Sequence, residues 1–297
     1  MKILFLHLSD LHLDNTGDID DSCIREMGNA LSVDSIGKVD KVFVFVTGDI
    51  AFSGKKSQYR LFGELKNKII GQIKARLLDN TLIHIYVVPG NHDICYPDHE
   101  LNRDSCESVI NNYSEASVIA DIKPFLAYEN AFLAFSSYQH SLSWKNPLFM
   151  RNVIDVGGFT IEINLINSTV FSLCHENDQG LHFLPNSIIS KLIAPSGADM
   201  AITLMHHSHQ WFNDKCKPVL EQALLEKNTM LFFGHEHYQA SQAISYNGVQ
   251  PAQVFCGGSL CNRGDWTSSK FYACIFDTDT FNCVNYDFSW NGEEKIY

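Results

Sequence analysis

Five apolar runs in this 297-residue chain are each followed at once by residues that can bind a metal ion. The runs span 2–8, 42–47, 83–88, 200–205 and 229–233, and their lengths are those of buried strands. They are followed, in order, by Asp10-Leu11-His12, Gly48-Asp49, Gly90-Asn91-His92-Asp93, His206-His207 and Gly234-His235-Glu236-His237. In a mainly parallel sheet the carboxyl ends of the strands meet at one rim, so the pattern predicts that the five clusters lie together.

A helix is predicted between two of these runs, over 57–78. One helical face carries Leu61, Leu65, Ile69, Ile73 and Leu77. Strand, helix and strand in this order indicate β-α-β units and therefore the α/β class. Further helices are expected near 186–194 and 216–227, and further strands at 153–156, 159–166, 169–174, 252–256, 271–277 and 282–288.

The segment of about 95–150 differs in composition from the rest of the chain. It is acidic as far as Asp121 and then aromatic from Phe125 to Trp144. We expect a partly helical insert over the main fold, within a single domain of residues 1–297. Its aromatic side chains either belong to a core or form a docking surface for a partner protein.

Charge and hydropathy exclude several classes of partner. The chain has 22 basic and 34 acidic residues, a net charge of −12. A protein that coats duplex nucleic acid or an anionic membrane needs a basic face. No segment has the roughly 18 consecutive apolar residues of a membrane span. These features favour a small substrate, and nothing in the sequence indicates the oligomeric state.

The cysteines and the N-terminus indicate a cytoplasmic protein. None of the nine cysteines forms a C-x-x-C pair, so we expect reduced and mostly buried thiols. The opening apolar run Ile3-Leu4-Phe5-Leu6 is too short for the core of a signal peptide.

The residue types in the five clusters select the metal chemistry. Carboxylates, imidazoles and one amide suit divalent manganese, and also iron, zinc, cobalt or nickel. There are enough donors for two ions if one carboxylate bridges them, and Asp49 is the candidate. Two ions about 3.5–4 Å apart polarise a phosphoryl group and acidify a shared water.

The motifs D-x-H, GD, GNH(D/E), H and GHxH resemble those of the calcineurin-like metallophosphoesterase superfamily, from Asp10 to His237. The resemblance implies a four-layer αββα sandwich of two mixed β-sheets flanked by helices. It implies one metal site formed by Asp10, His12, Asp49 and His237. It implies a second site formed by Asp49, Asn91, His206 and His235, and a catalytic His92 that stabilises the transition state or protonates the leaving oxygen.

Residues next to the motifs indicate which branch of the superfamily the chain resembles. The stretches 88–93 and 48–54 resemble the cyclic-nucleotide and glycerophosphodiester phosphodiesterases. Phosphoprotein phosphatases instead carry an Asp where this chain has Phe52, which leaves His92 without that carboxylate partner. Between His206 and the adjacent His207, the resemblance favours His206 as the ligand.

Other residues are candidates for the surroundings of the centre. The substrate-contact candidates are Asn91, His92, His207, Asn262 and Arg263, although Asn262 and Arg263 also fit a plain loop. We expect three further histidines at the rim: His175, His182 and His209.

The predicted function is hydrolysis of a phosphodiester or monoester by in-line attack of a hydroxide that bridges two metal ions. A small-molecule or nucleotide substrate is favoured. One alternative is a metal-dependent DNA or RNA nuclease. The other is a non-catalytic scaffold with the same fold, although every motif position is filled.

Overall fold

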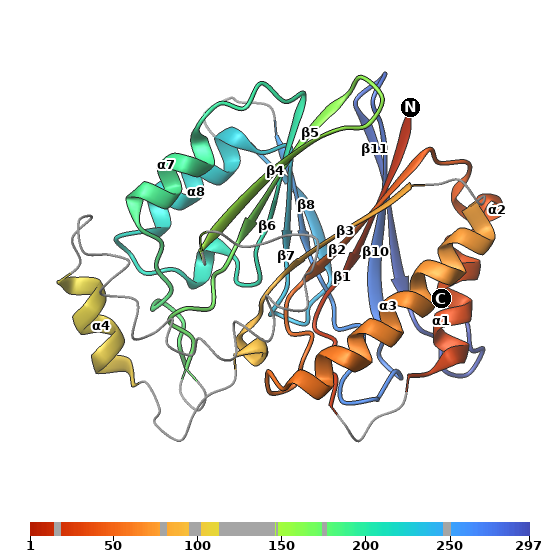
Figure 1. Cartoon of the computed structure of the whole chain (residues 1–297), viewed down its shortest axis with the longest axis horizontal. Coiled ribbons are helices and arrows are strands. Elements are labelled where there is room, and N and C mark those ends of the chain that lie inside the picture. The colour runs from red at the N-terminus through yellow and green to blue at the C-terminus, as the bar shows by residue number, and fades with distance from the viewer. Residues whose placement is uncertain are drawn as a thin grey trace.

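Two β-sheets pack face to face, and helices cover both outer faces (Figure 1). The computed structural model describes residues 1–14, 19–77, 82–94, 102–112, 146, 148–173, 177–245 and 251–297. The first sheet has the strand order β11-β10-β1-β2-β3. Its strands are β1 (Lys2–Leu8), β2 (Lys41–Thr47), β3 (Leu82–Val88), β10 (Lys270–Asp277) and β11 (Asn282–Ser289).

The second sheet has the strand order β4-β5-β6-β7-β9-β8. Its strands are β4 (Phe149–Asp155), β5 (Thr160–Ile166), β6 (Met200–Leu204), β7 (Met230–Phe233), β8 (Ala240–Ile244) and β9 (Ala252–Cys256). Both sheets are mixed: β1, β2 and β3 are parallel, as are β5, β6, β7 and β9, whereas β10, β11, β4 and β8 pair antiparallel.

Helices from different parts of the chain cover the two outer faces. Helices α1 (Asp21–Ala30) and α3 (Lys56–Leu77) cover the first sheet, with the short α2 (Val33–Ile36) beside them. Helices α7 (Asn186–Ile193) and α8 (Lys217–Lys227) cover the second sheet. The predicted αββα sandwich is confirmed.

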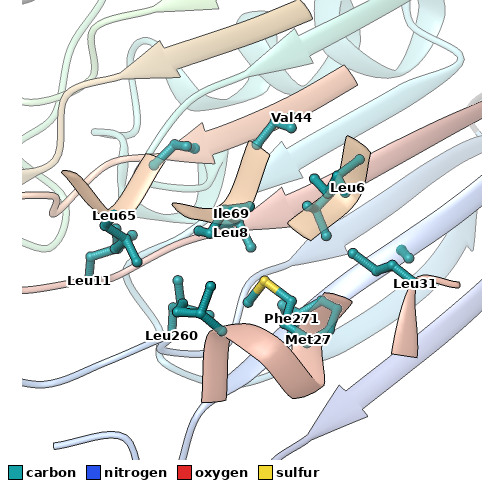
Figure 2. Close-up of a cluster of buried hydrophobic side chains, with 14 of the residues drawn as sticks. Leu6, Leu8, Leu11, Met27, Leu31, Val44, Leu65, Ile69, Leu260 and Phe271 are labelled. Atoms are coloured by element: carbon teal, nitrogen blue, oxygen red, sulfur yellow. The ribbon is translucent and has the colours of Figure 1, made fainter. Parts of the chain in front are cut away.

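The apolar runs that constrain the sequence are strands buried on both faces. Along β1, Ile3 and Phe5 point between the sheets, while Leu4 and Leu6 point toward the helices. Figure 2 shows the second contact, in which Leu6 lies in one cluster with side chains of α1 and α3 such as Met27 and Ile69. Because both faces are covered, these strands are mostly apolar, and the exceptions in β1 are the exposed Lys2 and the buried His7.

The predicted strand at 169–174 is wrong for the residues described there. After β5 the chain turns: the Asn167 side chain accepts from the backbone and the hydroxyl of Thr169, and Ser172 N–H donates to the Thr169 carbonyl. These local bonds replace a ladder with a neighbouring strand. Helix α1 and strand β8 are not expected from the sequence.

The insert of about 95–150 lies mostly outside the described residues. Its described part includes helix α4 (Arg103–Asn111), in which Cys106 and Ile110 are buried against the cluster beneath α7 and α8. Among the described residues no helix is long and apolar enough to cross a membrane.

The expectation of reduced thiols is wrong for one pair of cysteines. Cys274 and Cys283 form a disulfide that joins β10 to β11. The two residues lie diagonally across an antiparallel pair, with Cα atoms 6.4 Å apart, and a disulfide can span that separation. The cysteines described as free are Cys23, Cys106, Cys216, Cys256 and Cys261.

Candidate metal centre

The five predicted clusters meet at one end of the sandwich. They follow β1, β2 and β3 of the first sheet and β6 and β7 of the second. The expectation of a single rim is therefore corrected, because the strand ends come from two sheets that face each other. The structure brings all seven predicted metal ligands together through the contacts described next.

One group of ligand atoms comes from β1, β2 and β7. The ligand atoms of Asp10, His12, Asp49 and His237 all lie within 4.8 Å of one another. His237 Nε2 is 3.2 Å from Asp10 Oδ1 and 3.0 Å from His12 Nε2. The His237 side chain is half-exposed, whereas the other three are buried, so this group opens to solvent on one side.

A second group shares Asp49 with the first. Asn91 Oδ1 lies 3.0 Å from both His206 Nε2 and His235 Nδ1. Asp49 Oδ2 is 3.4 Å from His206 Nε2 and 3.8 Å from His12 Nε2, so this oxygen stands between the two groups. The shared position is the one that a bridging carboxylate requires.

The donors in both groups fit divalent cations. In each group, oxygen and imidazole nitrogen atoms face one another, and two nitrogens 3.0 Å apart can share at most one proton. His206 Nδ1 donates to the Thr47 carbonyl at 2.6 Å, which directs Nε2 into the site. A second ring nitrogen fixed on a backbone carbonyl is the usual arrangement of metal-binding histidines.

The electrostatics of the two groups also favour cations. Burial lowers the pKa of His206, but the charges of Asp49 and Asp10 and the hydrogen bonds to Asp49 and to the Thr47 carbonyl together outweigh burial and raise this pKa to about 9. The hydrogen bond to Asp10 raises the pKa of His237. Burial lowers the pKa of His12 and of His235 to about 4, so both rings are neutral and keep a free lone pair at neutral pH.

The backbone at the centre is strained. Five of the predicted ligands are non-glycine residues in the left-handed region, where each costs of the order of 1–3 kcal/mol. They are Asp10 (φ 53°), His12 (42°), Asp49 (51°), His235 (73°) and His237 (49°). Strain at so many adjacent positions persists only where the surrounding fold imposes it, which is typical of functional sites.

The glycines beside the ligands serve close packing more than turning. Gly48 has φ +91°, as a sharp turn requires. Gly90 does not have a positive φ, but an added Cβ there would lie 2.1 Å from Asp49 Oδ1. Glycine at position 90 therefore leaves room for the central carboxylate and is not needed for a sharp turn.

His92 is oriented by a backbone carbonyl. Its Nδ1 donates to the Phe52 carbonyl at 2.9 Å, which leaves Nε2 as the atom that can face a substrate. The half-buried ring lies edge-on to His12, with centroids 4.6 Å apart. Phe52 stands where phosphoprotein phosphatases carry the Asp partner, so its carbonyl supplies the missing acceptor.

Asp93 ties together the loops after β2 and β3. Its carboxylate accepts from the backbone N–H groups of Ile50, Ala51 and Gly90 and from the Tyr59 hydroxyl. Burial, together with the charge of Asp49, raises the pKa of Asp93 to about 6. Asp93 therefore holds the two loops together, whereas the acceptor for His92 Nδ1 is the Phe52 carbonyl.

His207 lies behind the centre. Its ring is buried, contacts Ser168 Oγ at 3.0 Å and stacks on His182 with centroids 3.9 Å apart. Asp178 lies 3.6 Å from His182. The ligand atoms of Asp178, His182 and His207 lie within 4.8 Å of one another, and so do those of His206, His207 and His235, so His207 connects this buried group to the centre.

Two aromatic side chains flank the centre. The Arg263 guanidinium lies 4.6 Å from the Phe52 ring centre and its Nε donates to Asp14 at 2.9 Å. On the other side, Trp211 stands edge-on to His235 at 4.2 Å, and its indole N–H donates to Glu236. The Arg263 guanidinium therefore places a positive charge near Phe52 and His92.

The remaining candidates lie further out. Asn262 is exposed in a turn that its backbone closes with Asp265. His209 is buried and pairs with Glu221 at 3.4 Å. His175 lies outside the described residues. The contributions of the Phe52 carbonyl and of Trp211 could not be predicted from the sequence, since any residue offers a carbonyl and a single Trp carries no pattern.

Comparison with known proteins identifies the family. The sequence matches the calcineurin-like phosphoesterase family, Metallophos, over residues 3–239. The chain belongs to this family. No curated protein matches the sequence.

Two solved structures are similar to this chain. The Haemophilus influenzae NAD nucleotidase NadN is 12% identical with a TM-score of 0.48, over 99% of this chain and 61% of that one. A novel archaeal phosphodiesterase is 13% identical with a TM-score of 0.36, over 97% of this chain and 100% of that one. The chain thus spans about three fifths of the length of the nucleotidase.

Proposed function

We propose that the protein hydrolyses small phosphodiesters or nucleotides with two divalent metal ions, of which manganese is the first candidate. Asp10, His12, Asp49 and His237 would hold one ion. Asp49, Asn91, His206 and His235 would hold the other. The observation that carries the proposal is the position of Asp49 Oδ2 between His12 and His206.

The bound ions would supply two effects: they polarise the phosphoryl oxygens and lower the pKa of a water between them. The chain's own residues do the rest. Asn91 places its amide oxygen 3.0 Å from His206 Nε2 and from His235 Nδ1. His92, fixed through Nδ1 by the Phe52 carbonyl, presents Nε2 to the departing oxygen.

Arg263 is the proposed substrate contact on the His92 side. Its Nε is engaged by Asp14, and the remaining guanidinium N–H groups belong to a half-exposed side chain. A guanidinium matches two oxygens of a phosphate group at once. Arg263 would therefore bind an anionic oxygen of the substrate, while the ions hold the reacting phosphate.

The first test is hydrolysis of bis(p-nitrophenyl) phosphate by the metal-free protein, with and without added Mn²⁺. We expect activity that requires Mn²⁺ and is lost on chelation. A Asp49→Asn variant should lose both activity and metal content, since the amide removes the shared charge. Activity that survives chelation would overturn the proposal.

A further inference from the structure

A buried chain of hydroxyl groups leads from β1 and β2 to Asp10. Ser9 Oγ lies 2.5 Å from Asp10 Oδ2, Thr47 Oγ1 lies 2.8 Å from Ser9 Oγ, and His7 Nε2 lies 2.8 Å from Thr47 Oγ1. All four side chains are buried, with at most 1% of each residue exposed. None of His7, Ser9 and Thr47 is among the proposed ligands.

Asp10 fixes the direction of every bond in this chain. An ionised carboxylate only accepts, so Ser9 must give its single hydroxyl hydrogen to Asp10. Thr47 must then donate to Ser9, and His7 must donate to Thr47 through Nε2–H. Burial lowers the pKa of His7 to about 3, so the ring is neutral and has no second N–H.

This hydrogen-bonded series of His7, Thr47, Ser9 and Asp10 leaves one buried polar atom without a partner. His7 Nδ1 is buried without a hydrogen-bond partner. The ring contacts Phe232 and Tyr272, and an apolar side chain in these surroundings would avoid that cost. A buried and partly unsatisfied histidine therefore needs a reason other than packing.

Two glycines hold Ser9 in place. A Cβ on Gly234 would lie 2.2 Å from Ser9 Oγ, and one on Gly257 would lie 2.7 Å from Ser9 Cβ. Both glycines follow strands of the second sheet, β7 and β9. Glycines of the second sheet therefore pack tightly against Ser9, while Thr47 of the first sheet donates a hydrogen bond to it.

We infer that His7, Thr47 and Ser9 form a positioning chain that occupies Asp10 Oδ2 and so directs Oδ1 to the first metal ion. Oδ1 is the oxygen that faces His237 Nε2 at 3.2 Å. The inference rests on the proposed function, because it assumes an ion at that position. These three residues are positioning residues, since they act through Asp10.

Substitutions at Thr47 can distinguish this positioning role from a general structural role. Its carbonyl orients His206 in the second group, while its hydroxyl serves Asp10 in the first. Thr47→Val removes the hydroxyl and keeps the carbonyl and the shape of the side chain. Thr47→Ser keeps both polar groups.

The test is calorimetric titration of the metal-free variants with Mn²⁺. Wild type should bind two ions. Thr47→Val and Ser9→Ala should weaken one of the two sites by about 10–100-fold and leave the other unchanged. Thr47→Ser should behave as wild type. Thr203→Val is the matched control: Thr203 is a buried strand hydroxyl that donates to Asn228 at 2.6 Å, and its loss should leave both affinities unchanged.

The outcomes are distinct. Equal weakening of both sites, equal effects of Thr47→Val and Thr47→Ser, or unchanged affinities in both Thr47→Val and Ser9→Ala would overturn the inference. Binding of fewer than two ions by wild type would instead overturn the proposed function. Thermal unfolding of each metal-free variant identifies any that does not fold, and Ser9→Ala then carries the comparison alone.

Discussion

At the scale of single residues, His92 depends on a backbone atom for its orientation. We expect His92→Ala to lower kcat by about 10²–10⁴-fold, because a positioned proton donor is lost. Metal content should stay unchanged, since the bond from this residue to Asp49 Oδ1 comes from its backbone N–H. Steady-state kinetics and elemental analysis check both parts.

Phe52→Leu is the matched control for His92. It keeps the carbonyl that accepts from Nδ1 and removes only the ring. The Phe52→Leu variant should therefore retain most of the wild-type kcat. If metal is lost together with activity in His92→Ala, the residue has a structural role instead.

Arg263 allows a second prediction at this scale. Arg263→Gln should raise KM for a phosphodiester and change kcat little, because a contact of equal strength in the ground and transition states is lost. Arg25→Gln is the control, since Arg25 is an exposed arginine of α1 whose guanidinium pairs with the neighbouring Glu26. A fall in kcat at constant KM would place Arg263 in the chemical step instead.

At the scale of elements, the loops after β2 and β3 are packed against each other without spare room. Gly90→Ala should abolish metal binding, because the new Cβ would collide with Asp49 Oδ1 and with the Asp49 backbone nitrogen at 2.3 Å. The control is Gly71→Ala in α3, where a Cβ meets nothing within 4 Å.

The Gly71 variant should be more stable than wild type by about 0.5–1 kcal/mol, because alanine favours the helix. Metal titration and thermal unfolding of both variants test the contrast. A Gly90→Ala protein with normal metal affinity would show that the loops can move apart.

The elements that could be predicted from the sequence are those buried on both faces. In β1 and β2 every position after the first is buried, so most of each strand is apolar and the strand can be predicted. In β8 the residues are mostly exposed and edge-paired, so no pattern marks the strand. For α1 a signal exists: Asp20 caps the helix through Ser22 N and Cys23 N.

In the metal centre, too, some contributions could be predicted from the sequence and others could not. Asp10 and His237 are predictable because only a few side-chain types bind divalent ions. The carbonyl of Phe52 and the chain through Thr47 are not, because the first is common to all residues and the second depends on which strands are neighbours. Pairing of β1 with β2 brings Thr47 beside Ser9, and the sequence does not state that pairing.

At the scale of the whole molecule, the net charge of −12 contrasts with the charge of the proposed centre. Two divalent ions would add +4 to the −2 of Asp10 and Asp49, which leaves about +2 at the site. A small anion would therefore be attracted locally, whereas a long nucleic acid would also meet the acidic surface.

This contrast predicts how salt affects the two substrate classes. Hydrolysis of bis(p-nitrophenyl) phosphate should vary little between 50 and 200 mM salt, because few charges are paired when it binds. Cleavage of single-stranded DNA should be weak at both salt concentrations. A nuclease that neutralises Z phosphates loses affinity with a slope of about −0.7Z in log K against log salt. Efficient DNA cleavage with a steep slope of this kind would show that a basic groove lies beside the centre, and the substrate would then be a nucleic acid.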